Sequence, residues 1–402
     1  MKVLSLTTLF PTRVQPVHAV FVFNRLSHMA KLAEVMVVAP IPYFPFDDLR
    51  PSYQYRRKVP ARDNIGNLEV IYPRYLSIPV ILKPLDGICL FLSVLFVIRK
   101  IRQDFDFDII DTHLAFPDGF VGILLGRIFK KPVSITLRGH DINVLPTEKF
   151  PVRKSMIEFA IKRANLVIGV ADALRRQAIA LGAAEVDSLT ISNGVDVNRF
   201  FLSSRRKARE KLKLPMARRI VLSIGRLVEN KGYHVIVEAL SVLRKQGAEI
   251  PYLVIVGSPG DEPEYAIILK ESIQKFGMQE QVLLVKEQAN DALCDWYNAA
   301  DVYCLASCVE GWPNVLLESL ACGTPVVATG TWGVPEIITS ERYGVLVKRT
   351  PESLAQGILA ALERDWIREE LSAYASTQTW HLTAQKVIDA FQKLLEASAR
   401  SK

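Results

Sequence analysis

Short apolar runs recur along this chain, and segments of helical length separate them. Alternation of this kind predicts parallel sheets covered by helices, because short apolar runs suit buried strands and the longer segments suit crossover helices. In the first half the runs are Val3–Leu6, Val35–Ala39, Ile109–Thr112, Val133–Leu137, Leu166–Val170 and Leu189–Ile191. In the second half they are Ile220–Ile224, Tyr252–Val256, Val282–Val285, Val302–Leu305, Pro325–Ala328 and Gly344–Val347. The pattern predicts an α/β fold with doubly wound parallel sheets.

The chain is long enough for two such domains. It has 402 residues, of which 50% are hydrophobic, so each half can bury a sizeable core. A charged stretch with few apolar residues, Ser203–Leu214, separates the two series of runs and is interpreted as the linker. We expect domains at 1–202 and 203–380. Ligands of doubly wound sheets bind beyond the carboxyl ends of the strands, so a cleft between the domains is the expected site.

Two carboxylates eight residues apart, Glu310 and Glu318, bracket a segment that predicts a helix start. Pro313 suits the first helical turn, where its missing N–H costs nothing. Glu310 then lies in the incoming loop, and Glu318 lies on the second turn. The free N–H groups of Asn314 and Val315 would face an anion such as a diphosphate. This arrangement suits a ligand with an anionic middle and hydroxylated ends.

Two cations follow the run Ile220–Ile224, in the sequences Gly225-Arg226-Leu227 and Asn230-Lys231-Gly232. Because they lie on the loop at the carboxyl end of a predicted strand, Arg226 and Lys231 could neutralise a diphosphate leaving group. Taken alone, the pair is equally consistent with a solvated turn. The later Glu310–Glu318 segment in the same domain favours the functional interpretation.

These motifs resemble the donor-binding domain of the family 4 retaining glycosyltransferases, whose E-x7-E signature Glu310 and Glu318 match. The flanking residues 320–328 and 333–336 fit the same family. The resemblance implies that Glu310 contacts the donor sugar, that Glu318 binds the ribose hydroxyls, and that Arg226 and Lys231 hold the diphosphate. The remaining donor-site residues that it implies are Gly311, Trp312, Pro313, Asn314 and Val315.

The resemblance also implies the GT-B fold, in which two Rossmann-like domains face each other. Residues 1–202 would bind the acceptor and residues 203–380 the nucleotide sugar, and the C-terminal helix within 381–402 would complete the first domain. The implied reaction retains the anomeric configuration, with the acceptor attacking from the face that the diphosphate leaves. No residue is an obvious covalent nucleophile, so positioning and charge stabilisation would do the catalytic work.

Several first-half residues are candidates for the acceptor side. The sequence Arg138-Gly139-His140-Asp141 follows a predicted strand and is similar to the family's His-containing loop. His140 could donate to a sugar hydroxyl or a developing oxyanion, or it could be a core histidine. His113 and Asn193 also lie where the family has cleft residues, and His113 is equally consistent with a structural role.

The loop Pro16-Val17-His18-Ala19 departs from the family, which usually has glycines there. His18 is therefore a weaker candidate for an acceptor contact.

The chain also contains Asp104-Phe105-Asp106-Phe107-Asp108, which holds the Asp-x-Asp that metal-dependent glycosyltransferases of another fold use. It precedes a predicted strand, so it lies at the amino end and away from the expected site. A solvated turn is the better interpretation. We expect neither a metal nor another cofactor, with the nucleotide-diphosphate sugar as donor substrate.

Charge is distributed unevenly. Residues 1–200 hold 26 Lys and Arg against 18 Asp and Glu, which accounts for the entire net charge of +8. A basic first half suggests an anionic partner, such as a membrane surface or a lipid-linked saccharide acceptor. Nucleic acid is disfavoured, because no recognition motif and no interleaved basic and aromatic run is present.

The segment Leu85–Ile98 is largely apolar and is followed by Arg99, Lys100 and Arg102. It is shorter than the roughly 20 apolar residues that a membrane span needs. The segment is consistent with two interpretations, a buried helix of the domain and a helix on the membrane surface. Residues 1–7 indicate a buried strand and not a signal peptide, so we expect a cytoplasmic protein, either free or on the inner face of the plasma membrane.

Two other enzyme classes have folds of this kind. A GT-B sugar-nucleotide epimerase or hydrolase has the same fold and would release nucleotide diphosphate without an acceptor. A nicotinamide-dependent dehydrogenase is disfavoured, because no Gly-x-Gly-x-x-Gly follows Val3–Leu6 or Ile220–Ile224.

Overall fold

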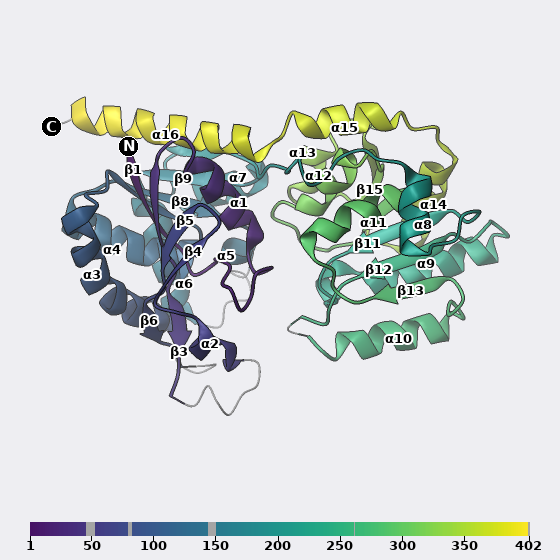
Figure 1. Ribbon diagram of the computed structural model, residues 1–402, viewed down its shortest axis with the longest axis horizontal. Coiled ribbons are helices and arrows are strands. Elements are labelled where there is room, and N and C mark those ends of the chain that lie inside the picture. Colours follow the sequence, from purple (N-terminus) through teal and green to yellow (C-terminus); the bar gives the residue numbers. More distant parts are fainter. Residues whose placement is uncertain (46–52, 79–82, 144–149, 261, 401–402) are drawn as a thin grey trace. The chain divides into compact units, whose positions relative to one another are not determined.

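The computed structural model describes residues 1–45, 53–78, 83–143, 150–260 and 262–400, without the side chains of Lys83, His140 and Asn143. The chain divides into two compact units (Figure 1). The N-terminal unit contains Met1–Asn193 and Trp380–Lys402, and the C-terminal unit contains Gly194–Thr379.

The N-terminal unit is built on an eight-stranded sheet with the order β10-β9-β8-β7-β1-β2-β5-β4. Its strands are β1 (Lys2–Leu6), β2 (Glu34–Val38), β4 (Arg62–Ile65), β5 (Leu68–Ile71), β7 (Ile109–Thr112), β8 (Val133–Leu137), β9 (Leu166–Gly169) and β10 (Ser188–Thr190). All six runs predicted as strands in this unit are strands of the sheet. Every pairing is parallel except that of β4 with β5. A separate two-stranded parallel sheet pairs β3 (Ile41–Tyr43) with β6 (Arg74–Leu76).

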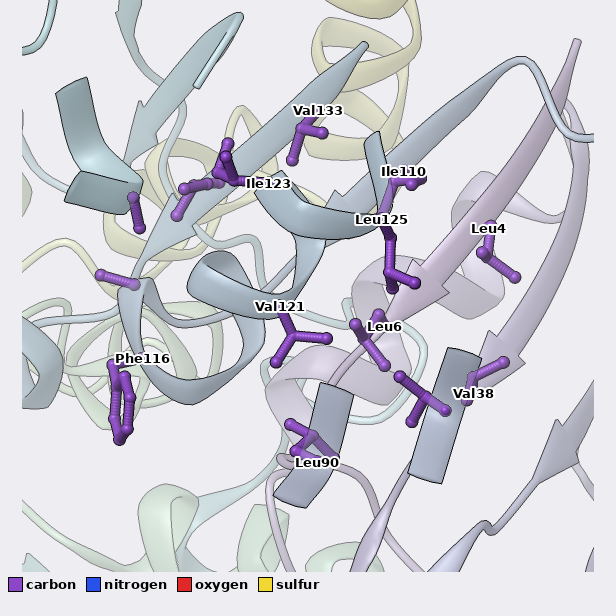
Figure 2. Packing of buried hydrophobic residues seen from close by; sticks show 14 of the residues in the cluster. Leu4, Leu6, Val38, Leu90, Ile110, Phe116, Val121, Ile123, Leu125 and Val133 are labelled. Atoms are coloured by element: carbon purple, nitrogen blue, oxygen red, sulfur yellow. The ribbon is translucent and has the colours of Figure 1, made fainter. Parts of the chain in front are cut away.

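Helices cover both faces of this sheet. The helices of this unit are α1 (Val20–Met29), α2 (Tyr55–Lys58), α3 (Asp86–Asp104), α4 (Phe120–Phe129), α5 (His140–Asn143), α6 (Pro151–Arg163), α7 (Asp172–Ala180) and α16 (Trp380–Arg400). On one face the buried residues come from α3, α4 and α6, and Figure 2 shows Leu90 of α3 and Val121 of α4 in the same core as Leu6 of β1. On the other face Val387 and Phe391 of α16 share a core with Leu26 of α1.

The segment Leu85–Ile98 falls within α3, and one face of that helix is buried in the core through Leu90, Val94 and Ile98. The buried-helix interpretation is therefore correct for this face. Among the described residues, no helix is long and apolar enough to cross a membrane.

The C-terminal unit has a six-stranded parallel sheet with the order β13-β12-β11-β14-β15-β16. Its strands are β11 (Ile220–Ile224), β12 (Tyr252–Val256), β13 (Val282–Val285), β14 (Val302–Leu305), β15 (Val326–Thr329) and β16 (Gly344–Val347). Its helices are α8 (Arg205–Leu212), α9 (Tyr233–Lys245), α10 (Tyr265–Lys275), α11 (Leu293–Ala299), α12 (Asn314–Ala321), α13 (Val334–Ile337), α14 (Pro351–Glu363) and α15 (Arg368–Ser376). All six predicted strands of this half are present.

The segment interpreted as a linker is instead a packed part of the C-terminal unit. Residues 205–212 form α8, and Arg209 within it is buried, with Nη2 2.6 Å from Oδ2 of Asp301. Just before α8, the N–H of Ser203 donates to Oδ1 of Asn298 over 2.7 Å. The charged composition suggested an exposed connection, but the arginine is neutralised and hydrogen-bonded inside the unit. The boundary between the units precedes Gly194, whereas the sequence pattern places it after residue 202.

Each large sheet reverses its strand order at one point. In the N-terminal unit the reversal lies at β1 and β7, and in the C-terminal unit it lies at β11 and β14. At such a point the loops after the two neighbouring strands lead in opposite directions, and doubly wound proteins generally bind their ligands at this carboxyl edge of the sheet. The predicted site residues follow strands at or beside these points, except Asn193, which follows β10 at the edge of the N-terminal sheet.

Candidate functional site

The loops after β11 and β14 are held together in the C-terminal unit. Asn230 bridges them through its side chain, whose Nδ2 donates to the carbonyl of Val309 and whose Oδ1 accepts from the N–H of Val309, each over 3.1 Å. Gly232 has φ +67°, and a Cβ there would lie 2.3 Å from the carbonyl oxygen of Ala306. Only glycine fits this position, because both the backbone conformation and the space exclude a side chain. The two loops therefore form one rigid unit.

This unit brings Lys231 and Glu310 into direct contact. Nζ of Lys231 lies 2.5 Å from Oε1 of Glu310, and both side chains are mostly buried. A charge-assisted hydrogen bond of this kind orients both groups at the carboxyl edge of the sheet. Two residues that the sequence analysis assigned to different parts of the donor are thus neighbours.

Arg226 is exposed on the same loop as Lys231.

The α12 helix begins at Asn314 and has no side-chain hydrogen bond at its N-cap, Pro313. Pro313 is thus the N-cap residue and does not belong to the first helical turn. Asn314 and Val315 lie in the first turn, as predicted. Trp312 is buried, and its indole N–H has no hydrogen-bond partner among the described residues. Gly311 is partly exposed in the loop before it.

Glu318 lies on the second turn of α12, as predicted from the position of Pro313. Its Oε2 accepts a hydrogen bond of 2.8 Å from the hydroxyl of Tyr297 on α11. Burial raises the pKa of the Glu318 carboxyl to about 7, although the hydrogen bond from Tyr297 and the charge of Arg199 act in the opposite direction. Its charge therefore changes near neutral pH.

Two residues of this region were missed from the sequence. Arg349 follows β16, and its Nε donates to the carbonyl of Ala306 over 2.8 Å while its Nη2 donates to the carbonyl of Glu229. Tyr233 begins α9 with a buried hydroxyl that has no hydrogen-bond partner among the described residues, and it interacts electrostatically with Glu310 and Arg226. No local motif marks either residue. Arg349 is brought close to these loops only by the order of the strands in the sheet, which the sequence pattern does not give.

In the N-terminal unit, Arg138 is held at the end of β8. Its Nη1 donates to Oδ1 of Asn193 over 2.7 Å, and its Nη2 donates to Nδ1 of His113 over 2.9 Å. Burial lowers the pKa of Arg138 to about 9, so the guanidinium remains charged at neutral pH. Three predicted residues, Arg138, His113 and Asn193, therefore form one cluster.

His113 is completely buried, and its burial determines whether the imidazole is protonated. Its Nε2 lies 3.1 Å from Oδ2 of Asp111 and 3.1 Å from Oγ of Ser5. Burial lowers the pKa of His113 to about 4, so the imidazole is neutral at pH 7. A neutral ring can accept from Arg138 at Nδ1 and donate from Nε2. His113 thus positions Arg138 from within the core.

Backbone N–H groups donate hydrogen bonds to both carboxylate oxygens of Asp141. The carboxylate accepts hydrogen bonds from the N–H groups of Arg138, Gly139 and Ala115 over 3.2, 2.9 and 3.0 Å. This arrangement fixes the loop that carries Arg138. His140 begins α5, but its side chain lies outside the described residues.

His18 is exposed in the turn before α1. Its backbone N–H donates to the carbonyl of Gln15 over 3.3 Å.

The Asp-x-Asp sequence lies at the amino end of β7, as predicted. Oδ1 of Asp106 is 3.2 Å from both Arg102 and Lys131, and Oδ2 of Asp108 accepts from the backbone N–H of Lys2 over 2.7 Å. In the described part of the chain, no group of three or more His, Cys, Asp or Glu side chains is arranged to hold a metal ion. The expectation that no metal is needed stays a prediction.

Comparison with known proteins identifies the family. A family model described as Glycosyltransferase Family 4 matches residues 18–199, and one described as Glycosyl transferases group 1 matches residues 204–378. The putative teichuronic acid biosynthesis glycosyltransferase TuaC of Bacillus subtilis is 27% identical over 372 residues, which cover 89% of this chain and 88% of TuaC. A D-inositol 3-phosphate glycosyltransferase of Corynebacterium urealyticum is 28% identical over 51% of this chain and 50% of its own length.

Solved structures show the same fold. Sucrose-phosphate synthase of Thermosynechococcus elongatus has a TM-score of 0.81 at 19% identity, covering 99% of this chain and 100% of that one. HepE of Anabaena, in complex with UDP, has a TM-score of 0.74 at 22% identity, covering 98% and 100%. The chain therefore belongs to glycosyltransferase family 4 and is a glycosyltransferase with the GT-B fold.

Proposed function

We propose that this enzyme is a retaining, metal-independent glycosyltransferase that moves a sugar from a nucleotide-diphosphate sugar to an acceptor hydroxyl. The observation that carries the proposal is the Lys231–Glu310 pair, with 2.5 Å between Nζ and Oε1, in the loops at the switch point of the C-terminal sheet. It supplies a cation for a diphosphate and a carboxylate for sugar hydroxyls within one rigid loop pair. The uncapped start of α12 adds N–H groups for the same anion.

In this proposal Arg226 and Lys231 stabilise the charge that develops on the leaving diphosphate, a task that a metal ion performs in other transferases. Glu310 binds the donor sugar, and Glu318 binds the ribose hydroxyls. The Anabaena HepE structures contain UDP, UDP with glucose, or UDP-glucose, which supports a nucleotide sugar as donor.

For the acceptor we propose a saccharide or a lipid-linked saccharide of cell-surface polysaccharide or glycolipid synthesis, used on the cytoplasmic side of the membrane. The name of TuaC supports a surface polysaccharide. Arg138, held by Asn193 and His113, supplies a fixed cation on the acceptor side. His140 is proposed to donate a hydrogen bond to the sugar or the developing oxyanion.

The donor is tested by thermal stabilisation of the purified protein with a panel of UDP, GDP, ADP and dTDP sugars, because a bound donor stabilises the folded state by mass action. The stabilising donor is then incubated with a bacterial lipid extract, with and without EDTA, and the anomeric configuration of the product is determined by NMR. We expect a retained configuration and equal rates with EDTA. Loss of activity that manganese restores would contradict metal independence. Release of free nucleotide diphosphate without an acceptor would instead indicate the epimerase or hydrolase.

The site is tested by Glu310→Ala, with Glu341→Ala in the same unit as the matched control. We expect turnover to fall by at least about a hundredfold in Glu310→Ala, since this side chain orients both the sugar and Lys231. Glu341 is exposed, so its removal should leave turnover unchanged. Near-normal transfer by a folded Glu310→Ala protein would refute the site assignment.

A further inference from the structure

The outer face of α3 carries an apolar stripe that the N-terminal unit does not cover. Ile88, Leu92 and Phe96 recur at four-residue intervals, and their exposed fractions are 43, 54 and 69%. Leu85, one turn before Ile88, is 42% exposed. Side chains at this spacing lie on one face of a helix. The opposite face is the one buried in the core, so α3 is apolar on both sides.

Cations continue this stripe at its C-terminal end. Arg99 lies one turn beyond Phe96, with its guanidinium 5.9 Å from the centre of that ring, and Lys100 follows it. Both are exposed, as is Lys130 at the end of the neighbouring helix α4. Among the residues that the structure describes, none of these three cations forms an ion pair with a carboxylate.

The ends of α3 and α4 are held beside each other. The guanidinium of Arg102 lies 5.4 Å from the centre of the Phe129 ring, and Asp106 contacts both Arg102 and Lys131. The unpaired cations of the two helices are therefore gathered at one edge of the unit. Figure 1 shows α3 and α4 next to each other along this side.

We propose that this face of α3 docks on an anionic lipid bilayer. Apolar side chains along one helix face, followed by unpaired cations, match the boundary between acyl chains and anionic headgroups. Leu85 to Arg99 spans about 21 Å at the helical rise per residue, which suits a helix lying in the plane of the interface. The surface is defined by Leu85, Ile88, Leu92, Phe96, Arg99 and Lys100, and we call it the α3 face.

A consequence that rests on the proposed function is that docking at this face would bring the enzyme to a lipid-linked acceptor. The N-terminal end of α3 is packed close to Phe116, which follows β7 and His113, since a Cβ on Gly87 would lie 2.9 Å from the Phe116 ring. The α3 face thus begins near the edge of the sheet that carries the Arg138 cluster. Docking itself requires no donor and no acceptor, so it can be tested apart from the proposed reaction.

The test is co-flotation of the full chain with vesicles of phosphatidylcholine alone or of phosphatidylcholine mixed with phosphatidylglycerol. We expect the wild-type protein to float with the mixed vesicles and to be released by salt. The double variant Leu92→Glu/Phe96→Glu should lose binding, and Arg99→Glu/Lys100→Glu should weaken it by at least about tenfold. Melting temperatures and donor-induced stabilisation identify any variant that is misfolded.

The matched control is Ile267→Glu/Ile268→Glu on α10 of the C-terminal unit. These residues are 61 and 49% exposed, so they are apolar and about as accessible as Leu92 and Phe96. They lie in a unit without excess positive charge. Their replacement should leave flotation unchanged. Equal flotation of the α3 variants and the wild-type protein would overturn the proposal. Sedimentation that shows a stable dimer, dissociated by Leu92→Glu, would assign the α3 face to a second copy and would also overturn it.

Discussion

The contact between Tyr297 and Glu318 predicts a specific pH dependence of donor binding. The Tyr297 hydroxyl donates to the Glu318 carboxyl over 2.8 Å, and burial raises the pKa of that carboxyl to about 7. In the proposed site Glu318 accepts hydrogen bonds from ribose hydroxyls, and the ionised carboxylate is the stronger acceptor. Donor affinity should therefore rise with pH through this pKa.

The variant Tyr297→Phe removes one hydroxyl and keeps the ring, which packs against Phe200 and Tyr303. A hydrogen bond to a charged acceptor stabilises by about 1 to 1.5 kcal/mol more than one to a neutral acceptor. The Tyr297 hydroxyl therefore favours the ionised form of Glu318 by about one pKa unit. The pKa of Glu318 should thus rise from about 7 to about 8. At pH 7 the ionised fraction falls from about one half to about one tenth, so donor binding weakens about fivefold.

The assay is isothermal titration calorimetry with the stabilising donor between pH 5.5 and 9.5. The variant should bind the donor about tenfold more weakly than the wild type near pH 5.5 and about fivefold more weakly at pH 7, and the two affinities should converge above pH 9, where both carboxyls are ionised. Tyr303→Phe is the matched control, because its hydroxyl bonds to the backbone of Ile224 and not to a carboxylate. A loss of affinity in Tyr297→Phe that is the same at every pH would refute the reasoning.

Two stability predictions concern the C-terminal unit. Gly232→Ala should lower the free energy of unfolding by about 2 to 4 kcal/mol, through a positive φ and a clash with a backbone carbonyl, whereas Gly247→Ala, with φ +72° and open space around it, should cost only about 1 kcal/mol. Equal losses would contradict the close loop contact. Arg209→Met should cost about 3 kcal/mol because it leaves Asp301 without its closest buried cation, while Arg206→Met, an exposed control on α8, should cost about 0.5 kcal/mol or less. Urea unfolding measures all four, and an unaffected Arg209→Met protein would show that the buried pair contributes nothing to stability.

The sequence predicted the twelve main strands and the position of Glu318, because both depend on local patterns. Apolar runs suffice to identify strands buried on both faces, and Pro313 fixes where α12 begins. The edge strand β4 was missed, because it contains Arg62, Asp63 and Asn64 and has no apolar run. Its neighbour β5 was also missed, although three of its four residues are apolar. An edge strand that pairs on one side can remain polar, so hydrophobic pattern does not reveal it.

Long-range contacts account for the remaining differences. Ser203–Leu214 has the composition of a solvated linker, but Arg209 is buried because Asp301, distant in sequence, neutralises it. Arg349 was missed for the same reason, since its carbonyl partners belong to loops that only the strand order brings near β16. His113 could be read from the sequence as a cleft residue or a core residue. Its complete burial and its contact with Arg138 show that it acts from the core on a neighbouring cation.

The cations of both units are oriented by side chains of the protein itself. Lys231 is held by Glu310, and Arg138 is held by His113 and Asn193. A long side chain that is already ordered avoids a cost of about 0.5 to 1.5 kcal/mol on binding. In the proposed reaction Lys231 faces a diphosphate whose negative charge grows as the glycosidic bond breaks, and a fixed cation stabilises that charge without reorganisation. The carboxylate that orients Lys231 is also the group proposed to bind the sugar, so donor binding and leaving-group stabilisation depend on the same contact.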